Sequence, residues 1–236
     1  MPVIHGKATS VLVDQYNLSI YFNSADYTTT METAETTTFG ASAKTFLPGL
    51  LAASVSLSGF FDTGTGGGDE ILRAALSTST PDVLSIAPQG ITTIGNRATL
   101  GMIHQTSYQV SAPVGDVVAA SAEMEATNGL WGGVVLADLA ARTTSSNTSS
   151  VDNAASSANG GVANVHLTGV TALTSLVVKI QHSTDNSSWS DLITFATLSA
   201  VGAENKTVTG TVNRYTRVLW TLTGTSVTFA VTFARK

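Results

Sequence analysis

The sequence contains no cysteine, which excludes disulfide bonds, thiol catalysis and cysteine-ligated metal sites. Charged residues are also scarce, since they make up 11% of the 236 residues, less than half of the usual fraction. Thr, Ser, Ala, Gly and Val are abundant instead; Thr and Val favour strands, whereas Lys and Glu, which favour exposed helix, are few. So few surface charges protect weakly against self-association. The composition indicates a mainly β protein whose surface is covered by further copies of itself, or a β-sandwich that associates readily.

Long apolar runs are missing as well. The longest apolar stretch, residues 47–57, is interrupted by Pro48, Gly49 and serines, and is too short to cross a membrane. The first seven residues, MPVIHGK, lack the apolar run and the small-residue cleavage site of a signal peptide. We therefore predict no membrane association and a protein that is made and kept in a cytoplasm.

Residues 143–163 mark the clearest boundary in the chain. They are small and polar, with no aromatic side chain and one charge, Asp152, so they cannot bury enough apolar surface to fold alone. Charge divides at the same place, because residues 1–142 have a balance of −7 and residues 143–236 a balance of +2. The sequence therefore predicts two domains, 1–142 and 164–236, joined by a linker over 143–163.

The first domain opens with a predicted strand in which Leu18, Ile20 and Phe22 share one face. A Thr-rich segment from Ser24 to Phe46 follows and is predicted to be a long loop. A loop of this length in a compact domain is functional or disordered. Its candidate functional residues are Thr28, Glu32, Glu35 and Lys44.

Two later segments alternate between apolar and polar residues. Over residues 51–58 and 120–125, one set of alternate positions is apolar and the other carries serine or glutamate. This pattern is typical of strands in a sheet with one buried and one wet face. Further strands are predicted at 83–86 and 98–110, so the first domain is expected to be a β-sandwich or barrel. The polar positions of the two alternating segments are Ser54, Ser56, Ser58, Ser121, Glu123 and Glu125.

One helix is predicted after the glycine-rich segment 64–68. Asp69 can cap its start, an apolar stripe runs over 71–76, and Pro81 stops it. The glycines do not form a nucleotide-binding loop, because Asp69 stands where a dinucleotide fingerprint needs glycine and no Gly-Lys-Ser/Thr follows. We interpret the segment as a flexible turn before a helix.

The second domain consists of predicted strands and turns. Alternating residues over 176–182, 218–222 and 227–233 predict strands, and the polar turn at 185–188 separates the first of these from another strand. Short strands at regular spacing indicate a β-sandwich of seven or eight strands.

No residue pattern in the sequence indicates catalysis or metal binding. Glu123 and Glu125 project to one face, but nothing apolar or basic nearby in the sequence separates their pKa values, so a solvated acidic face is favoured over a catalytic pair. Asp185 and Asn186 form a hairpin turn in preference to a calcium site. No histidine has metal-ligand spacing, and His182 is predicted to be a core-edge residue with a satisfied hydrogen bond. The four histidines are His5, His104, His166 and His182.

Trp189 and Trp220 could form a platform for sugars, but both lie where a sandwich core needs a large residue, and core is the favoured interpretation. Nucleic-acid readout is not expected, because the first domain is acidic and basic residues do not cluster with aromatic ones. The nearest approach to a basic patch is formed by Arg214, Arg217, Arg235 and Lys236.

The order of elements in the first domain resembles the tail tube (major tail) proteins of siphophages. The matching features are the polar N-terminus, the strand over 11–22, the loop over 24–46, the Pro48-Gly49-Leu50 entry into the strand that ends SGFFD at 58–62, and the helix over 69–77. The second domain resembles the immunoglobulin-like sandwich appended to actinobacteriophage tail tubes. Its matching residues are VVKIQHS at 177–183, Asp185-Asn186 through Trp189, and NRY at 213–215 before VLW at 218–220.

This resemblance implies a structural protein without enzyme activity or cofactor. Tail tube proteins form stacked hexameric rings, in which strands of all subunits join into one inner β-barrel that conducts the genome. The resemblance implies that the six serines and glutamates of the alternating segments face the lumen and that the loop 24–46 reaches the neighbouring ring. An acidic bore would repel DNA phosphates.

The implied partners are further copies of the chain, tape-measure, tail terminator and baseplate proteins, and passing double-stranded DNA that is not bound specifically. The implied location is the virion tail, after assembly in the host bacterial cytoplasm. Two alternatives stay open: a head-decoration or receptor-binding virion protein that holds carbohydrate through Trp189, and a hydrolase with Glu123 and Glu125 as its acid and base.

Overall fold

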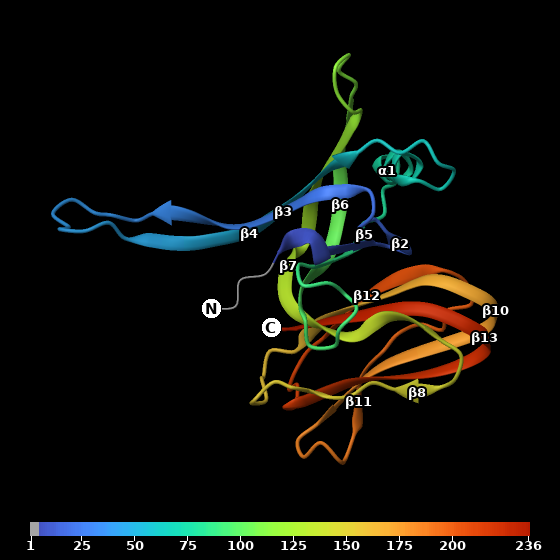
Figure 1. The fold of residues 1–236 in the computed structure, drawn as a ribbon. Coiled ribbons are helices and arrows are strands. Elements are labelled where there is room, and N and C mark those ends of the chain that lie inside the picture. Colours follow the sequence, from blue (N-terminus) through green and yellow to red (C-terminus); the bar gives the residue numbers. More distant parts are fainter. Residues whose placement is uncertain (1–4) are drawn as a thin grey trace. The chain divides into compact units, whose positions relative to one another are not determined.

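The computed structural model describes residues 5–236 and shows a mainly β protein with a single α-helix in that range (Figure 1). The prediction of a mainly β fold with one helix is confirmed. The residues of the predicted polar N-terminus before His5 lie outside the described range. No helix in the described residues is long and apolar enough to span a membrane.

The chain divides into two compact units, and each is discontinuous in sequence. One unit, called here the large unit, comprises residues 5–20, Asp82–Met102 and Trp131–Lys236. The other, called the hairpin unit, comprises Tyr21–Pro81 and Ile103–Leu130. The strands β6 (Arg97–Ser111) and β7 (Ala119–Arg142) contribute residues to both. The compact units therefore differ from the predicted ranges 1–142 and 164–236.

The large unit is built around two long antiparallel strands, β10 (Gly161–Ser183) and β13 (Tyr215–Arg235), which pair from Gly161↔Arg235 to Ser183↔Tyr215. On one side the sheet continues to β7, and β11 and β12 pair with β10. The remaining strands of the unit are β1 (Ser10–Val13), β2 (Tyr16–Asn17), β5 (Asp82–Ala87), β8 (Ser146–Asn147), β9 (Val151–Asp152), β11 (Ser190–Thr194) and β12 (Gly202–Val208), and a 3-10 turn covers Gly6–Ala8.

Residues 229–234 of β13 are all buried, so this strand is covered on both faces. Phe229, Val231 and Phe233 belong to the main core, whereas Ala230 and Ala234 pack in two smaller clusters with residues of β1, β5, β6 and β10. Burial on both faces explains why a strand in this unit reads as a continuous apolar run.

The segment 143–163 is not a free linker. It forms β8 and β9, which pair with β13, and a further bridge joins Ser157 to Val212. Its polar side chains take part, since Thr148 Oγ1 accepts a hydrogen bond from the Val218 N–H at 2.9 Å. The segment gains its order from hydrogen bonds to a neighbouring strand and buries little apolar surface of its own, which is why composition alone predicted a linker.

The hairpin unit holds a four-stranded antiparallel sheet in the order β3-β4-β7-β6, with β3 at Phe22–Glu35 and β4 at Phe46–Phe60. Helix α1 (Gly68–Leu76) buries Ile71 and Leu72. Its cap is Gly67, and Asp69 instead pairs with Arg73 and accepts a hydrogen bond from Tyr108 of β6 at 2.8 Å. The predicted helix is confirmed, but its predicted cap is wrong.

The start of the chain differs from the prediction. Residues 18–21 form a turn between β2 and β3, so they do not share a strand with Phe22. Leu18 is fully buried, whereas Ile20 is 79% exposed, although a strand would place both on the same face. The alternation in this short stretch arose by chance.

Candidate functional site

The two alternating segments lie side by side in the hairpin unit. Strand β4 pairs with β7 so that Ser54 is opposite Glu125, Ser56 is opposite Glu123 and Ser58 is opposite Ser121. Directly opposite residues of an antiparallel pair project to the same face. The structure therefore brings all six predicted polar residues together on one face of the sheet.

The opposite face of these strands is buried. Val55, Leu57 and Ala122 are fully buried and Met124 is 1% exposed. The alternation thus separates a core face from a polar face, as the sequence predicted, except that Leu51 is exposed. On the polar face, the four serines are half-buried and the two glutamates are exposed.

Strand β3 extends the polar face by one more strand. Its register places Ser24 opposite Ser58, Asp26 opposite Ser56 and Thr28 opposite Ser54. Sequence reasoning missed Asp26, because the segment was expected to be a loop. The nine residues of the acidic face, as we call it here, include three carboxylates and no lysine or arginine: Ser24, Asp26, Thr28, Ser54, Ser56, Ser58, Ser121, Glu123 and Glu125.

The acidic face offers no acid–base chemistry. Glu123 and Glu125 are both exposed, and the Ser56 hydroxyl donates a hydrogen bond of 2.8 Å to Glu123 Oε1. General acid–base pairs need two carboxyl groups in different environments, and these two share an open surface. In residues 5–236, no group of three histidine, aspartate or glutamate side chains could hold a metal ion.

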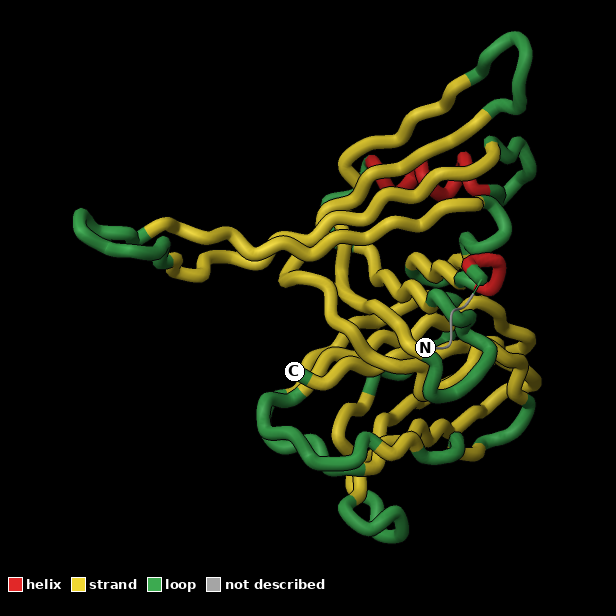
Figure 2. The backbone as a smooth tube through the Cα atoms, turned by 60° about the vertical axis from the view of Figure 1, so that its left-hand side comes forward, coloured by secondary structure: helices red, strands yellow, loops and turns green. Residues whose placement is uncertain are grey.

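The Thr-rich segment is not a loop: it forms one strand, β3, and the turn of the hairpin that β3 makes with β4. Strands β3 and β4 pair as far as Glu35↔Phe46, and only residues 36–45 turn between them. Figure 1 shows this hairpin in blue, and in Figure 2 it is a long pair of yellow strands ending in a green turn. The four predicted loop residues therefore occupy a strand and the hairpin end.

The outer half of the hairpin is exposed on all sides. Every residue from Tyr27 to Ala52 is exposed, and Lys44 forms a 3.0 Å ion pair with Glu35 across the hairpin end. Hydrogen bonds from Lys44 and Thr37 lower the pKa of Glu35. Besides Tyr27, six large apolar side chains of this region face solvent: Met31, Phe39, Phe46, Leu47, Leu50 and Leu51. An isolated two-stranded hairpin is marginally stable in water, and clustered exposed apolar groups mark contact surfaces.

The sheet of the hairpin unit has one open edge. Among the described strands, β3 pairs with β4 alone, so its outer edge presents unpaired backbone groups over Phe22–Glu35. At the other side of the sheet, β6 pairs with β5 as well as with β7. Natural proteins cover or pair long edges, because unpaired edges drive association.

A shallow cavity of about 380 Å³ adjoins the acidic face in the same unit. It is lined by polar and apolar groups together, including Asn23, Ser58, Phe60, Gln109, Asp116 and Ser121. Phe60 is 56% exposed and contributes to the apolar surface here. Among the residues that line the cavity, Asp116 alone is charged.

A serine–histidine pair in the large unit is closed to substrate. Ser85 Oγ lies 2.8 Å from His166 Nε2, a distance suited to nucleophile activation. Both residues are fully buried, so no substrate can reach the hydroxyl. His182 accepts a hydrogen bond from the Asn213 N–H at 3.1 Å, which confirms its predicted role as a core-edge residue.

The two tryptophans have different surroundings. Trp220 is 7% exposed and belongs to the main core, as predicted. Trp189 lies outside the buried core, and the Arg217 guanidinium stands 4.1 Å from its ring centroid. The core prediction for Trp189 is wrong, because the residue precedes β11 and is only half-buried.

The Asp185 carboxylate is fully used within its own turn. It accepts hydrogen bonds from the N–H groups of Ser187 and Ser188, and these bonds lower its pKa. The hydroxyl of Ser183 also donates to it at 2.8 Å. This is a self-contained turn, as predicted.

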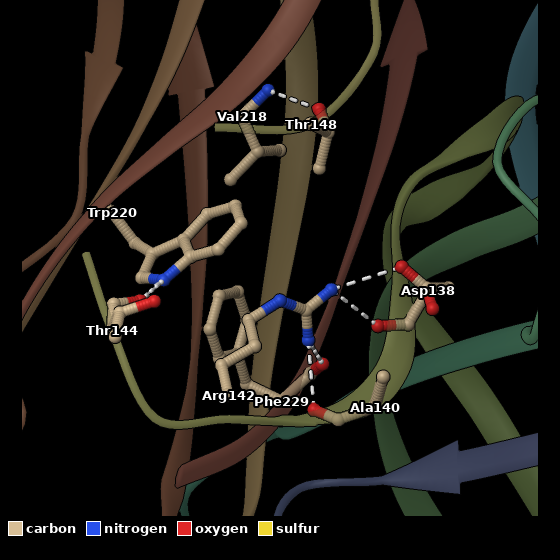
Figure 3. A network of polar contacts seen from close by, with 8 residues as sticks. All are labelled: Asp138, Ala140, Arg142, Thr144, Thr148, Val218, Trp220 and Phe229. Carbon is tan, nitrogen blue, oxygen red and sulfur yellow. Dashed lines mark hydrogen bonds and ion pairs between the residues drawn. The ribbon is translucent and has the colours of Figure 1, made fainter. Parts of the chain in front are cut away.

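Arg142 closes the end of β7 against β13 (Figure 3). Its guanidinium donates to the backbone oxygens of Asp138, Ala140 and Phe229 and lies 4.2 Å from the Phe229 ring centroid and 5.0 Å from that of Trp220. Burial lowers its pKa, while the ion pair with Asp138 at 3.0 Å favours the charged form. Sequence reasoning did not single out this residue, because nothing local distinguishes it from a surface arginine.

No family model and no curated protein matches this chain. Solved structures with some similarity include the virion of a native gene transfer agent particle, at 16% identity over 54% of this chain and 97% of that chain, with a TM-score of 0.46. The SPP1 tail tube is 14% identical over 55% of this chain and 78% of that chain, with a TM-score of 0.46. The SPP1 Dit protein is 13% identical over 96% of this chain and 98% of that chain, with a TM-score of 0.41. At these values, the similarity assigns neither a family nor a function to this chain.

Proposed function

We propose that this chain is a structural, non-enzymatic virion protein that assembles with copies of itself into stacked rings and forms a phage tail tube, a conduit for genome ejection. The observation that carries the proposal is the sheet of the hairpin unit, which has one buried face, one acidic face and an open edge along β3. Such a sheet is complete only when its open edge is paired.

Pairing between copies would complete the sheet. If β3 of one copy pairs with the opposite side of the sheet in the next, the contact is heterologous, and a heterologous contact that closes makes a ring. A closed ring of strands is a barrel without free edges. The number of six subunits follows the sequence resemblance to siphophage tail tube proteins.

The acidic face is suited to the inside of such a barrel. Its three carboxylates and its hydroxyl groups repel or weakly contact the phosphates of double-stranded DNA, so DNA passes without binding. The buried face then packs against α1 on the outside of the barrel. We therefore assign the acidic face to the lumen.

The exposed β3–β4 hairpin is assigned to contacts between stacked rings. Its six large apolar side chains are exposed in a single copy and would be buried by a partner surface. In an assembly of many copies, a neighbouring copy of the chain is always present to provide that surface. Tape-measure, tail terminator and baseplate proteins are the further partners that a tail tube requires. Assembly takes place in the host cytoplasm and the product belongs to the virion tail, with residues 164–236 as an immunoglobulin-like outer region.

Electron microscopy of the purified protein tests the proposal. We expect rings or tubes at high protein concentration. Replacement of residues 31–51 by a short Gly-Ser turn should give folded protein that forms no stacked tubes. A wild-type protein that stays monomeric at every concentration tested would contradict the proposal.

The alternative of a receptor- or carbohydrate-binding virion protein is favoured by one observation, the position of Trp189 outside the core. A glycan array separates the two functions. Saccharide binding that is lost in Trp189→Ala, together with an absence of rings in the wild type, would favour the alternative.

A further inference from the structure

A chain of buried polar side chains runs through the interior of the large unit. Ser85 of β5, Asn164 and His166 of β10 and Thr232 of β13 are all fully buried. Ser85 Oγ lies 2.8 Å from Thr232 Oγ1, and Asn164 Nδ2 donates to the Leu84 carbonyl at 2.7 Å. Asn205 of β12 donates to Asn164 Oδ1 at 2.6 Å, so the chain of contacts joins four strands. Buried polar groups need such partners, because an unpaired one is costly.

The hydrogen bonds of His166 define its protonation. Nδ1 lies 2.7 Å from the Asp14 carbonyl, which can only accept, so Nδ1 carries the proton. Nε2 then accepts from the Ser85 hydroxyl at 2.8 Å. If the imidazole were charged, Nε2 would also carry a proton and would face the Ser85 hydroxyl as a donor in a fully buried site. Burial lowers the pKa of His166 to about 4, so the ring is neutral in the folded protein at mildly acidic pH.

Two carboxyl groups meet at Asp14, the residue whose backbone carbonyl contacts this histidine. Asp82, at the start of β5, is 9% exposed and is hydrogen-bonded to the side chain of Asp14, whose Oδ1 also accepts from the Val83 N–H at 2.8 Å. Asp14 sits in the turn after β1 with a φ of 48°, a region that short polar residues tolerate best. Burial, followed by the charge of Asp14, raises the pKa of Asp82 to about 7.

We propose that Asp82 and His166 form a compensating pair of buried ionisable groups, which keeps the stability of the large unit level from mildly acidic to neutral pH. The ionisable members of the cluster are Asp14 from the turn after β1, Asp82 from β5 and His166 from β10. The groups that face them from β12 and β13, Asn205 and Thr232, are uncharged.

The two groups act in opposite directions. Folded Asp82 keeps a proton that the unfolded chain loses above its ordinary pKa of 3.8, so its contribution to stability falls as pH rises toward about 7. Unfolded His166 takes up a proton below its ordinary pKa of 6.5 that the folded state excludes, so its contribution falls as pH drops toward about 4. Each group alone changes the unfolding equilibrium constant by up to about tenfold per pH unit. The two changes have opposite signs, so they cancel over the pH range in which both contributions vary.

Urea unfolding between about pH 4.5 and 6.5 tests the pair in wild type, Asp82→Asn and His166→Gln. Relative to wild type, the unfolding constant of Asp82→Asn should fall by up to about tenfold per pH unit as pH rises, and that of His166→Gln should rise by a similar factor. Asp116→Asn, an exposed carboxyl change in the hairpin unit, serves as control and should follow wild type. If the unfolding constants of both variants changed with pH in parallel with that of wild type, the proposal would be overturned.

A titration of the wild-type protein by NMR gives a second measurement that needs no variant. The His166 ring should stay neutral down to about pH 4.5. A ring that titrates near its ordinary value, in protein that is still folded, would overturn the proposal even if His166→Gln fails to fold.

Discussion

The large unit and the hairpin unit differ in where they place polar and apolar side chains. The large unit carries seven acidic and nine basic side chains, a balance of +2, and pairs buried serine, asparagine and histidine inside its core. The hairpin unit carries nine acidic and two basic side chains, a balance of −7, and leaves large apolar groups in solvent along its hairpin. The first pattern is typical of a unit whose own core accounts for its fold, and the second of a unit that is completed by a partner.

A matched pair of phenylalanine changes should separate the two patterns most strongly. Phe229→Ala removes a fully buried ring that packs edge-to-face on Trp220 at 5.7 Å, and we expect a loss of about 3–5 kcal/mol in the free energy of unfolding. Phe39→Ala changes a fully exposed ring, so the monomer should keep its stability while assembly weakens. Urea unfolding and light scattering measure the two effects. Equal destabilisation by both changes would remove the distinction between the units.

The Arg142 site should show the next largest effect. Arg142→Met leaves the carbonyls of Ala140 and Phe229 without their donor, and we expect a loss of about 2–3 kcal/mol. Arg142→Lys keeps the charge but not the planar fork, and should lose an intermediate amount. If Arg142→Met is as stable as wild type by urea unfolding, the guanidinium is dispensable and apolar packing alone holds the end of β7.

Neutralising the acidic face should alter assembly function and leave the fold unchanged. The triple change Asp26→Asn, Glu123→Gln and Glu125→Gln removes the carboxylates from an exposed surface, so the far-UV spectrum and unfolding midpoint should match wild type. Assembled tubes of the variant should retain double-stranded DNA at low salt more than wild-type tubes do. Retention that is unchanged at every salt concentration would place the acidic face away from the bore.

The smallest effect is expected at an exposed ion pair of the large unit. Arg214 holds Asp152 by two hydrogen bonds of 2.7 Å, which lower the pKa of Asp152 to about 2. The contribution of this ion pair to the free energy of unfolding is present above the ordinary pKa of 3.8 and is lost as pH falls toward about 2. Asp152→Asn should therefore shift the thermal midpoint only slightly at neutral pH, and less still below pH 3, as measured by calorimetry. A large shift would show that charge pairs, and not the core, dominate the large unit.

Alternation was reliable over 51–58 and 120–125, whereas the shorter alternation over 18–22 was not. The serines at 54, 56 and 58 and the glutamates at 123 and 125 were correctly assigned to polar faces, because a strand with one buried face fixes the orientation of every side chain. The β3–β4 hairpin was mistaken for a loop because its outer half buries nothing, so no hydrophobic period marks it. The segment 143–163 was mistaken for a linker for the same reason.

Long-range contacts were beyond local patterns. His166, Asp14 and Asp82 are far apart in the sequence, and only the pairing of β1 with β5 and the packing of β10 against them bring the three together. No local signal distinguished Trp189, which lies outside the core, from Trp220, which lies in it.

The sequence by itself determined the strand-rich fold, the single helix and the two faces of β4 and β7, because period-two burial and turn chemistry are local properties. Only the tertiary structure decided which strands are neighbours, so only it could add Asp26 to the acidic face, expose the edge of β3 and close a core around Ser85 and His166. Strand pairing depends on contacts between distant segments, and their energies are absent from any short window of residues.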